Sequence, residues 1–126
     1  IKQAALHLDA TVFDIRMSPR SYHKQYTQNG LIELLGDRYV WVKEWGNANY
    51  KGQGVRILDY DSGYRIFNLD TRPAAIIMCG CADYDHCHRR YIDTFLQGAG
   101  FDVQELSTIL DQLPTESDSL FSEVAS

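Results

Sequence analysis

The sequence Ala74-Ala75-Ile76-Ile77-Met78-Cys79 is a continuous apolar run that follows Pro73. A run of this length without polar alternation is typical of a strand covered on both faces, as in the middle of a parallel sheet. Residues 87–99 come shortly after it with apolar side chains at helical spacing, and Gly98 and Gly100 supply a stop signal. This part of the chain therefore predicts a buried strand that leads into a helix.

Further strands and helices alternate along the chain. The expected strands cover residues 11–15, 38–43, 74–79 and 101–106. The expected helices cover residues 1–8, 22–35 (capped by Ser18 or Ser21) and 87–99, with 44–54 as a long surface loop and 55–72 ambiguous. Apolar and polar residues alternate in 101–106, which suits an edge strand. The alternation of elements predicts an α/β fold with a mostly parallel sheet flanked by helices on both faces.

The chain has room for one small domain. It has 126 residues, of which 44% are hydrophobic and 23% charged. We assign 1–113 to a single α/β domain and 114–126 to an acidic C-terminal tail, in which Leu120, Phe121 and Val124 could dock a short helix. The net charge of -5 does not provide the basic field expected of a general nucleic-acid binder.

The sequence contains no sign of a membrane or secreted protein. No stretch approaches the ~18 consecutive apolar residues of a membrane span, and no charged-then-apolar leader opens it. Three clustered cysteines, an odd number, do not fit a secreted disulfide framework. We therefore expect a soluble, cytoplasmic protein with reduced thiols and no membrane partner. The chain opens on Ile1 rather than a methionine, so we expect leading residues ahead of it.

Reactive side chains gather directly after the central strand. The segment 78–90 holds all three cysteines, two of the four histidines and an arginine pair. The thiols can act as nucleophiles or metal ligands, the imidazoles can carry protons, and the guanidinium groups can bind anions. In open parallel sheets, ligands bind beyond the carboxyl ends of the strands. We therefore expect segments 16–21 and 79–86, which leave two such ends, to face one another.

Cys87, His88 and Arg89 stand at the head of the expected helix, with Asp83 or Asp85 available as its cap. The positive end of a helix lowers a thiol pKa and attracts anions. We assign Cys87 and His88 to catalysis, with His88 as general acid or base, and Arg89 to anion binding. The alternative is structural: Cys87 and His88 would be buried on the apolar side of the helix, with His88 hydrogen-bonded to a strand end.

Cys81 is a second candidate nucleophile, because it stands at the mouth of the expected site. Phosphate-cleaving cysteine enzymes have a Cys-x5-Arg loop, with an arginine six positions after the nucleophile. The sixth position after Cys81 is Cys87, which argues against that chemistry. The three cysteines and a histidine of this segment could instead hold a metal, although their spacing is not that of a standard zinc site. We assign neither a metal nor a cofactor.

The other half of the expected site follows the first strand. Asp14 lies within an apolar strand, where a charge is costly to bury unless it is paired, and Arg16 shares its face. The two could form a buried ion pair that fixes the loop, or Asp14 could be catalytic. Arg20 follows Pro19 and could bind phosphate or carboxylate through two parallel hydrogen bonds. We assign Asp14 to catalysis and Arg16 and Arg20 to anion binding.

These elements together resemble the family known as domain of unknown function 488. The residues that carry the resemblance are Phe13-Asp14-Ile15-Arg16, Pro19-Arg20-Ser21, Met78-Cys79-Gly80-Cys81, Cys87-His88-Arg89-Arg90 and the loop 45–51. It extends from the first residue to Leu106 and implies a small α/β domain that usually opens with a further strand and a glycine-bearing turn. We therefore expect the first strand to be missing here. The family has no settled activity, so the resemblance strengthens the fold and the site but not a reaction.

Two classes of function remain open. One is an enzyme that acts on a small anionic compound, phosphorylated or nucleotide-like, with arginines as clamps, a cysteine as nucleophile and His88 as proton carrier. The other is a non-catalytic module for nucleic acid or a partner protein, in which aromatic side chains beside Lys43, Lys51 and Arg56 would stack bases. The commoner place of such aromatics is the core. They are Tyr22, Tyr26, Tyr39, Trp41, Trp45 and Tyr50.

Overall fold

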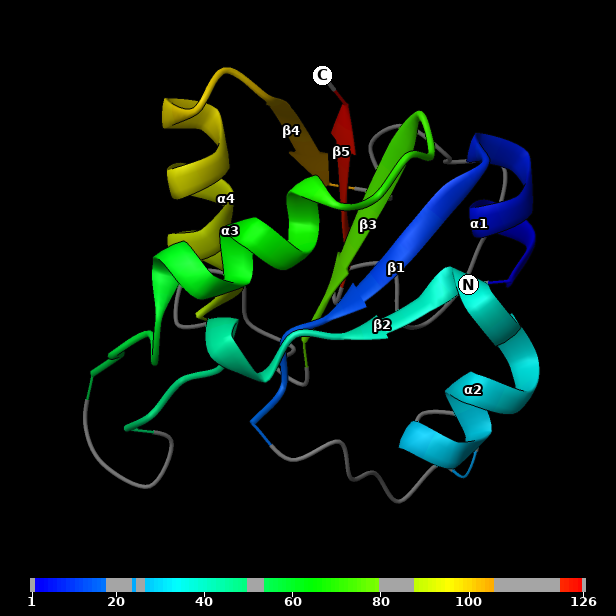
Figure 1. The fold of residues 1–126 in the computed structure, drawn as a ribbon, viewed down its shortest axis with the longest axis horizontal. Coiled ribbons are helices and arrows are strands. Elements are labelled where there is room, and N and C mark those ends of the chain that lie inside the picture. The colour runs from blue at the N-terminus through cyan, green and yellow to red at the C-terminus, as the bar shows by residue number, and fades with distance from the viewer. Residues whose placement is uncertain are drawn as a thin grey trace.

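The computed structural model describes residues 2–17, 24, 27–49, 54–79, 88–105 and 121–125 (Figure 1). Within them the strands are β1 (Ala10–Asp14), β2 (Tyr39–Trp41), β3 (Ala74–Met78), β4 (Asp102–Glu105) and β5 (Phe121–Ala125). The α-helices are α1 (Lys2–Leu8), α2 (Gln28–Leu35), α3 (Tyr60–Asn68) and α4 (Arg89–Gly98), and the 3-10 helices are η2 (Gly36–Arg38) and η3 (Lys43–Trp45).

The strands form one open sheet in the order β2-β1-β3-β5-β4. The strand β1 pairs in parallel with β2 and β3, and Asp14 lies opposite Trp41 on one side and Met78 on the other. The strand β5 runs antiparallel to both β3 and β4, so β4 points the same way as β3 and lies at an edge of the sheet. The predicted α/β class and the edge position of β4 are confirmed.

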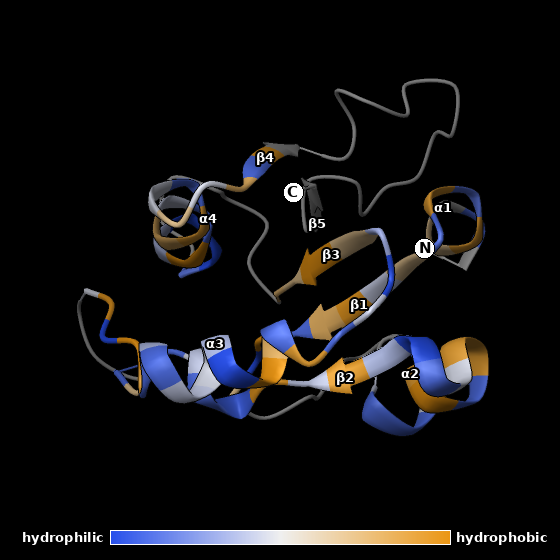
Figure 2. Ribbon diagram, turned by 45° about the horizontal axis from the view of Figure 1, so that its top comes forward, coloured by the Kyte–Doolittle hydropathy of each residue, from blue (hydrophilic) through white to orange (hydrophobic). Residues whose placement is uncertain are grey.

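Helices cover both faces of this sheet, as the sequence predicts. One core packs α1 and α2 against the strands, and its buried members are Ala5, Ala10, Val12, Leu31, Leu35, Ala74, Ile76 and Met78. The other packs η3, α3 and α4, with Phe13, Ile15, Val42, Trp45, Phe67, Ala75, Ile77, Cys79, Ile92 and Leu96 buried. Successive residues of β1 and β3 alternate between the two cores because strand side chains alternate in direction. Most of both strands is apolar (Figure 2), and each buried Ile or Leu contributes roughly 1.5–3 kcal/mol.

Three elements differ from the expectation. The helix expected over 22–35 is α2, which begins at Gln28 because the Thr27 side chain accepts a hydrogen bond from the Gly30 backbone N–H at 3.1 Å. The ambiguous stretch 55–72 contains α3, capped by Asp59. Residues 121–125 form β5 rather than a short helix, since both neighbours in the sheet supply hydrogen-bonding partners along their length.

The segment expected as a surface loop contributes one of the largest core residues. Trp45 is fully buried, and its indole Nε1–H donates to the Tyr60 carbonyl at 2.9 Å. Gly63 lies directly against the ring: a Cβ there would come within 2.1 Å of Trp45 Cδ1. The helix α3 therefore packs on Trp45 only because position 63 has no side chain.

Candidate functional site

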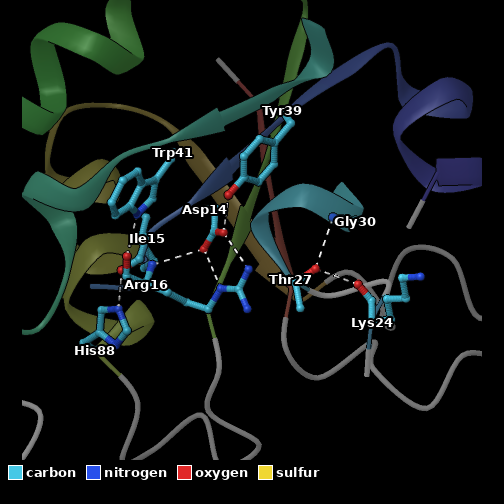
Figure 3. A network of polar contacts seen from close by, with 9 residues as sticks. All are labelled: Asp14, Ile15, Arg16, Lys24, Thr27, Gly30, Tyr39, Trp41 and His88. Carbon is cyan, nitrogen blue, oxygen red and sulfur yellow. Dashed lines mark hydrogen bonds and ion pairs between the residues drawn. The ribbon is translucent and has the colours of Figure 1, made fainter. Parts of the chain in front are cut away.

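The carboxylate of Asp14 lies at the end of β1 and is completely buried (Figure 3). Its Oδ1 accepts from Arg16 Nε at 2.8 Å and its Oδ2 from Arg16 Nη2 at 2.7 Å, while the Arg16 backbone N–H reaches Oδ1 at 3.2 Å. The two side chains share a face and form a buried ion pair, as the sequence predicts. Such a two-point pair fixes the plane of the guanidinium.

Tyr39 completes this cluster from the neighbouring strand β2. Its hydroxyl donates to Asp14 Oδ2 at 2.6 Å, so each carboxylate oxygen accepts two hydrogen bonds. A carboxylate has about four lone-pair positions, and these contacts use all of them. Burial, followed by the hydrogen bond and the charge of Asp14, raises the pKa of Tyr39. Tyr39 is therefore a protonated donor at neutral pH that orients the carboxylate.

The Arg16 guanidinium remains charged in this buried place. Burial alone would lower its pKa, but the hydrogen bonds and charge of Asp14 outweigh burial and raise it. The pair with Asp14 engages Nε–H and one Nη2–H, and the other three N–H groups of the guanidinium are not used by this pair. The main chain is held as well, because Trp41 Nε1–H donates to the Arg16 carbonyl at 2.7 Å.

His88 joins the start of α4 to the end of β1. Its Nε2 lies 2.8 Å from the carbonyl oxygen of Ile15 (Figure 3). Because a carbonyl only accepts, Nε2 carries the hydrogen, and in the neutral ring Nδ1 then holds the lone pair. This is the contact to a strand end that the structural alternative expects, and it ties the N-cap of α4 to the residue that follows β1.

The beginning of α4 differs from the expectation. The helix starts at Arg89, its N-cap is His88, and the His88 side chain makes no capping hydrogen bond. Asp83 and Asp85, one of which the sequence predicts as the cap, lie outside the residues that the structure describes. The helix ends at Gly98 as predicted, followed by Gly100 at a φ of 99°.

Arg89 is fully buried on the inner face of α4 rather than at the surface. Asp93, four residues further on, is 1% exposed on the same face. Ile92 and Leu96 are buried on this helix too, so α4 carries two charged side chains into the interior together with its apolar ones. An anion could reach Arg89 only from within the fold.

Several predicted site residues lie outside the part of the chain that the structure describes: Arg20, Cys81 and Cys87. Cys79 is described and is a buried, reduced member of the core on the α3 and α4 side. Among the described residues, no group of three or more His, Cys, Asp or Glu side chains could hold a metal ion. The structure thus brings together Asp14, Arg16 and His88 of the predicted set.

The sequence did not assign Tyr39 and Trp41 to this site, and it grouped both with a stacking surface for bases. Both instead hold residues 14–16 in place. Trp45, from the same group, is in the core. The signal that could have found Tyr39 is a tyrosine in the strand next to an apolar strand that contains an aspartate, since such a carboxylate needs donors.

A scan against protein-family models, a search of the curated proteins and a search of the solved structures each found no match. The resemblance to domain of unknown function 488 therefore stays a prediction from the residues quoted above. None of the helices within the described residues is long and apolar enough to cross a membrane.

Proposed function

We propose that the protein binds a small anionic compound, phosphorylated or nucleotide-like, next to Arg16 at the carboxyl edge of the sheet. The observation that carries this proposal is the fixed Arg16 guanidinium, which is held at two points by Asp14 and has 8% of its side chain exposed. A hydrogen bond from a charged donor in such a desolvated place is stronger than one in water. In parallel sheets this edge is where ligands bind.

Residues 14–16, at the end of β1 and directly after it, are held in place before any ligand binds. Tyr39 holds Asp14, Trp41 holds the Arg16 carbonyl, and His88 holds the Ile15 carbonyl. A site whose side chains are already held by their neighbours loses less entropy on binding. These contacts therefore support recognition of a ligand of defined shape, with Arg20 as a second clamp on the same segment.

In this proposal Asp14 is a positioning residue and not the catalytic base. Its two oxygens already accept four hydrogen bonds, so a proton from a substrate would have to displace one of them. The nucleophile is Cys81 or Cys87. A proton carried by His88 would move through Nδ1, since Nε2 donates to Ile15. The clustered thiols also support a cytoplasmic location.

The test is a pH-dependent alkylation profile of the three thiols, followed by mass spectrometry with and without inorganic phosphate and a nucleotide mixture. We expect Cys81 or Cys87 to react with a pKa well below ~8.5 and to be protected by the anion. Arg16→Lys keeps the charge but loses the two-point pair with Asp14, so protection should weaken at least about tenfold. The matched control is Arg72→Lys, because Arg72 pairs with Asp37 and Asp70 away from this cluster.

The outcomes separate the two classes of function. If all three thiols are alkylated slowly and anions do not protect them, the cysteine mechanism is wrong. Anion binding without thiol reactivity would favour the non-catalytic module instead. If the anion still protects the thiol in Arg16→Lys but no longer does so in Arg72→Lys, Arg16 is not part of the site.

A further inference from the structure

A pocket of about 450 Å³ lies between the first residue of α3 and the first turns of α4. Pockets for small molecules commonly measure ~300–1,000 Å³. The described residues that line it are Tyr60, Arg90, Tyr91, Thr94 and Phe95. None of these five residues belongs to the cluster around Arg16.

The aromatic wall of this pocket is held in place by the core. The rings of Tyr60 and Phe95 have centroids 5.1 Å apart, and the ring of Tyr64 meets Phe95 edge-on at 5.5 Å. The main chain of Tyr60 is fixed by the buried Trp45, which donates to its carbonyl at 2.9 Å. Because two helices and a core tryptophan position these rings, the pocket exists before a ligand binds.

Tyr91 forms the open side of the pocket. It is 46% exposed, which is unusual for a large aromatic side chain in a helix that buries its opposite face. Tyr60 and Phe95 are half-buried beneath it. A flat ring that enters here would remove the Tyr91 ring from water and pack against aromatic surface, and such pairs contribute about 0.5–1.5 kcal/mol beyond the area they bury.

The pocket also has a positively charged side chain in its lining. The exposed Arg90 supplies a guanidinium, and no acidic side chain is among the described residues that line the pocket. Burial, with the nearby Tyr91 phenol as a further cause, raises the pKa of Tyr60, so its hydroxyl stays neutral and does not repel an anion. The chain as a whole has a net charge of -5, so such a cation beside three aromatic rings is a local feature.

We propose that this pocket binds a small molecule with a planar aromatic ring and a negatively charged group. The ring packs against Tyr60, Tyr91 and Phe95, and the charged group pairs with the Arg90 guanidinium. The described residues of this pocket do not belong to the cluster around Arg16, so different variants test the two proposals.

The experiment titrates the full chain with adenosine 5′-monophosphate by calorimetry and maps the site by backbone amide NMR. We expect shifts at Tyr60, Tyr91 and Thr94, and affinity at least about tenfold above that of adenosine or inorganic phosphate, since each probe lacks one half of the ligand. Tyr91→Ala should weaken binding about tenfold, whereas Tyr91→Phe keeps the ring and the affinity.

The charge is tested separately. Arg90→Gln should reduce the affinity for the nucleotide to that for adenosine, whereas Arg65→Gln, an exposed arginine on α3 outside the pocket lining, should leave it unchanged. Equal affinity for adenosine and the nucleotide, or full affinity in Tyr91→Ala, would overturn the proposal. Shifts confined to residues 14–16 would overturn it too, but would support the function proposed at Arg16.

Discussion

The imidazole Nε2 of His88 lies 2.8 Å from the carbonyl oxygen of Ile15, although 73 residues separate them in the chain. Both residues are buried. The bond ties the segment that leaves β1 to the first turn of α4, so the two halves of the candidate site are held at a fixed distance.

The first prediction concerns this bond. His88→Ala removes the donor to a buried carbonyl, which costs about 1–3 kcal/mol for the group left unsatisfied. The free energy of unfolding from urea denaturation at neutral pH should fall by that amount. His7→Ala is the matched control, because His7 is exposed on α1, and its effect should stay within about 0.5 kcal/mol. Equal stability of the two variants would show that the His88 bond does not stabilise the fold.

The second prediction concerns the ion pair of Asp14 and Arg16, whose side chains are 0% and 8% exposed. Asp14→Leu leaves a buried cation and Arg16→Met a buried anion, so each should lower the free energy of unfolding by about 3–5 kcal/mol. The double variant replaces both charges with apolar groups and should lose far less than the sum.

An exposed ion pair provides the comparison. Arg72 Nη2 lies 3.4 Å from Asp37, whose side chain is 91% exposed. Asp37→Asn should therefore change stability by less than about 1 kcal/mol. If the losses from Asp14→Leu and Arg16→Met simply add in the double variant, the two buried charges are not coupled.

The pair of Asp14 and Arg16 could be predicted because it depends only on the two-residue period of a strand. Tyr39 could not. Its contact with Asp14 depends on the register of β2 against β1, in which Tyr39 lies opposite Val12. That register joins strands more than twenty residues apart in the chain, and no local sequence pattern reveals it.

Trp45 and Arg89 show two other limits of the sequence. Trp45 sits in a polar stretch that resembles a loop, and it is buried because Gly63, eighteen positions away, leaves room for its ring. In α4 the buried face includes Arg89 and Asp93. Because both residues are charged, the apolar pattern does not mark them as buried, and it includes Tyr91, which is exposed.

The third prediction concerns the pH dependence that Tyr39 causes. Its pKa in the folded state is raised above the unfolded value of about 10. The stabilisation is thus fully present below pH ~10 and is lost as the pH rises past that value, because the unfolded chain releases the proton first. At neutral pH, Tyr39→Phe should cost about 1.5–3 kcal/mol, since it removes a hydrogen bond to a charged group.

Denaturation curves from pH 9 to 11.5 measure this effect. Above pH ~10 the stability of the natural sequence should fall faster than that of Tyr39→Phe, by up to about 1.4 kcal/mol per pH unit, the slope for one proton. Parallel curves for the two proteins would show that Tyr39 does not keep its proton in the fold.

The fourth prediction compares two helical glycines. At Gly63 a Cβ would lie 2.1 Å from both Cδ1 and Nε1 of Trp45, a ring that is fully buried and bonded to the Tyr60 carbonyl. The ring cannot withdraw without breaking that bond, so Gly63→Ala should cost at least about 1–3 kcal/mol.

At Gly98 a Cβ would meet nothing within 4 Å. Gly98→Ala should therefore be neutral or stabilise the protein by up to about 1 kcal/mol, because alanine loses less backbone entropy in a helix than glycine. Thermal unfolding of the two variants gives the difference directly, and tryptophan fluorescence in a Trp41→Phe background reports whether the Trp45 indole has moved. A Gly63→Ala protein as stable as Gly98→Ala, with unchanged fluorescence, would mean that α3 can shift away from Trp45 at little cost. The packing of α3 on Trp45 would then not be what positions Tyr60 beside α4.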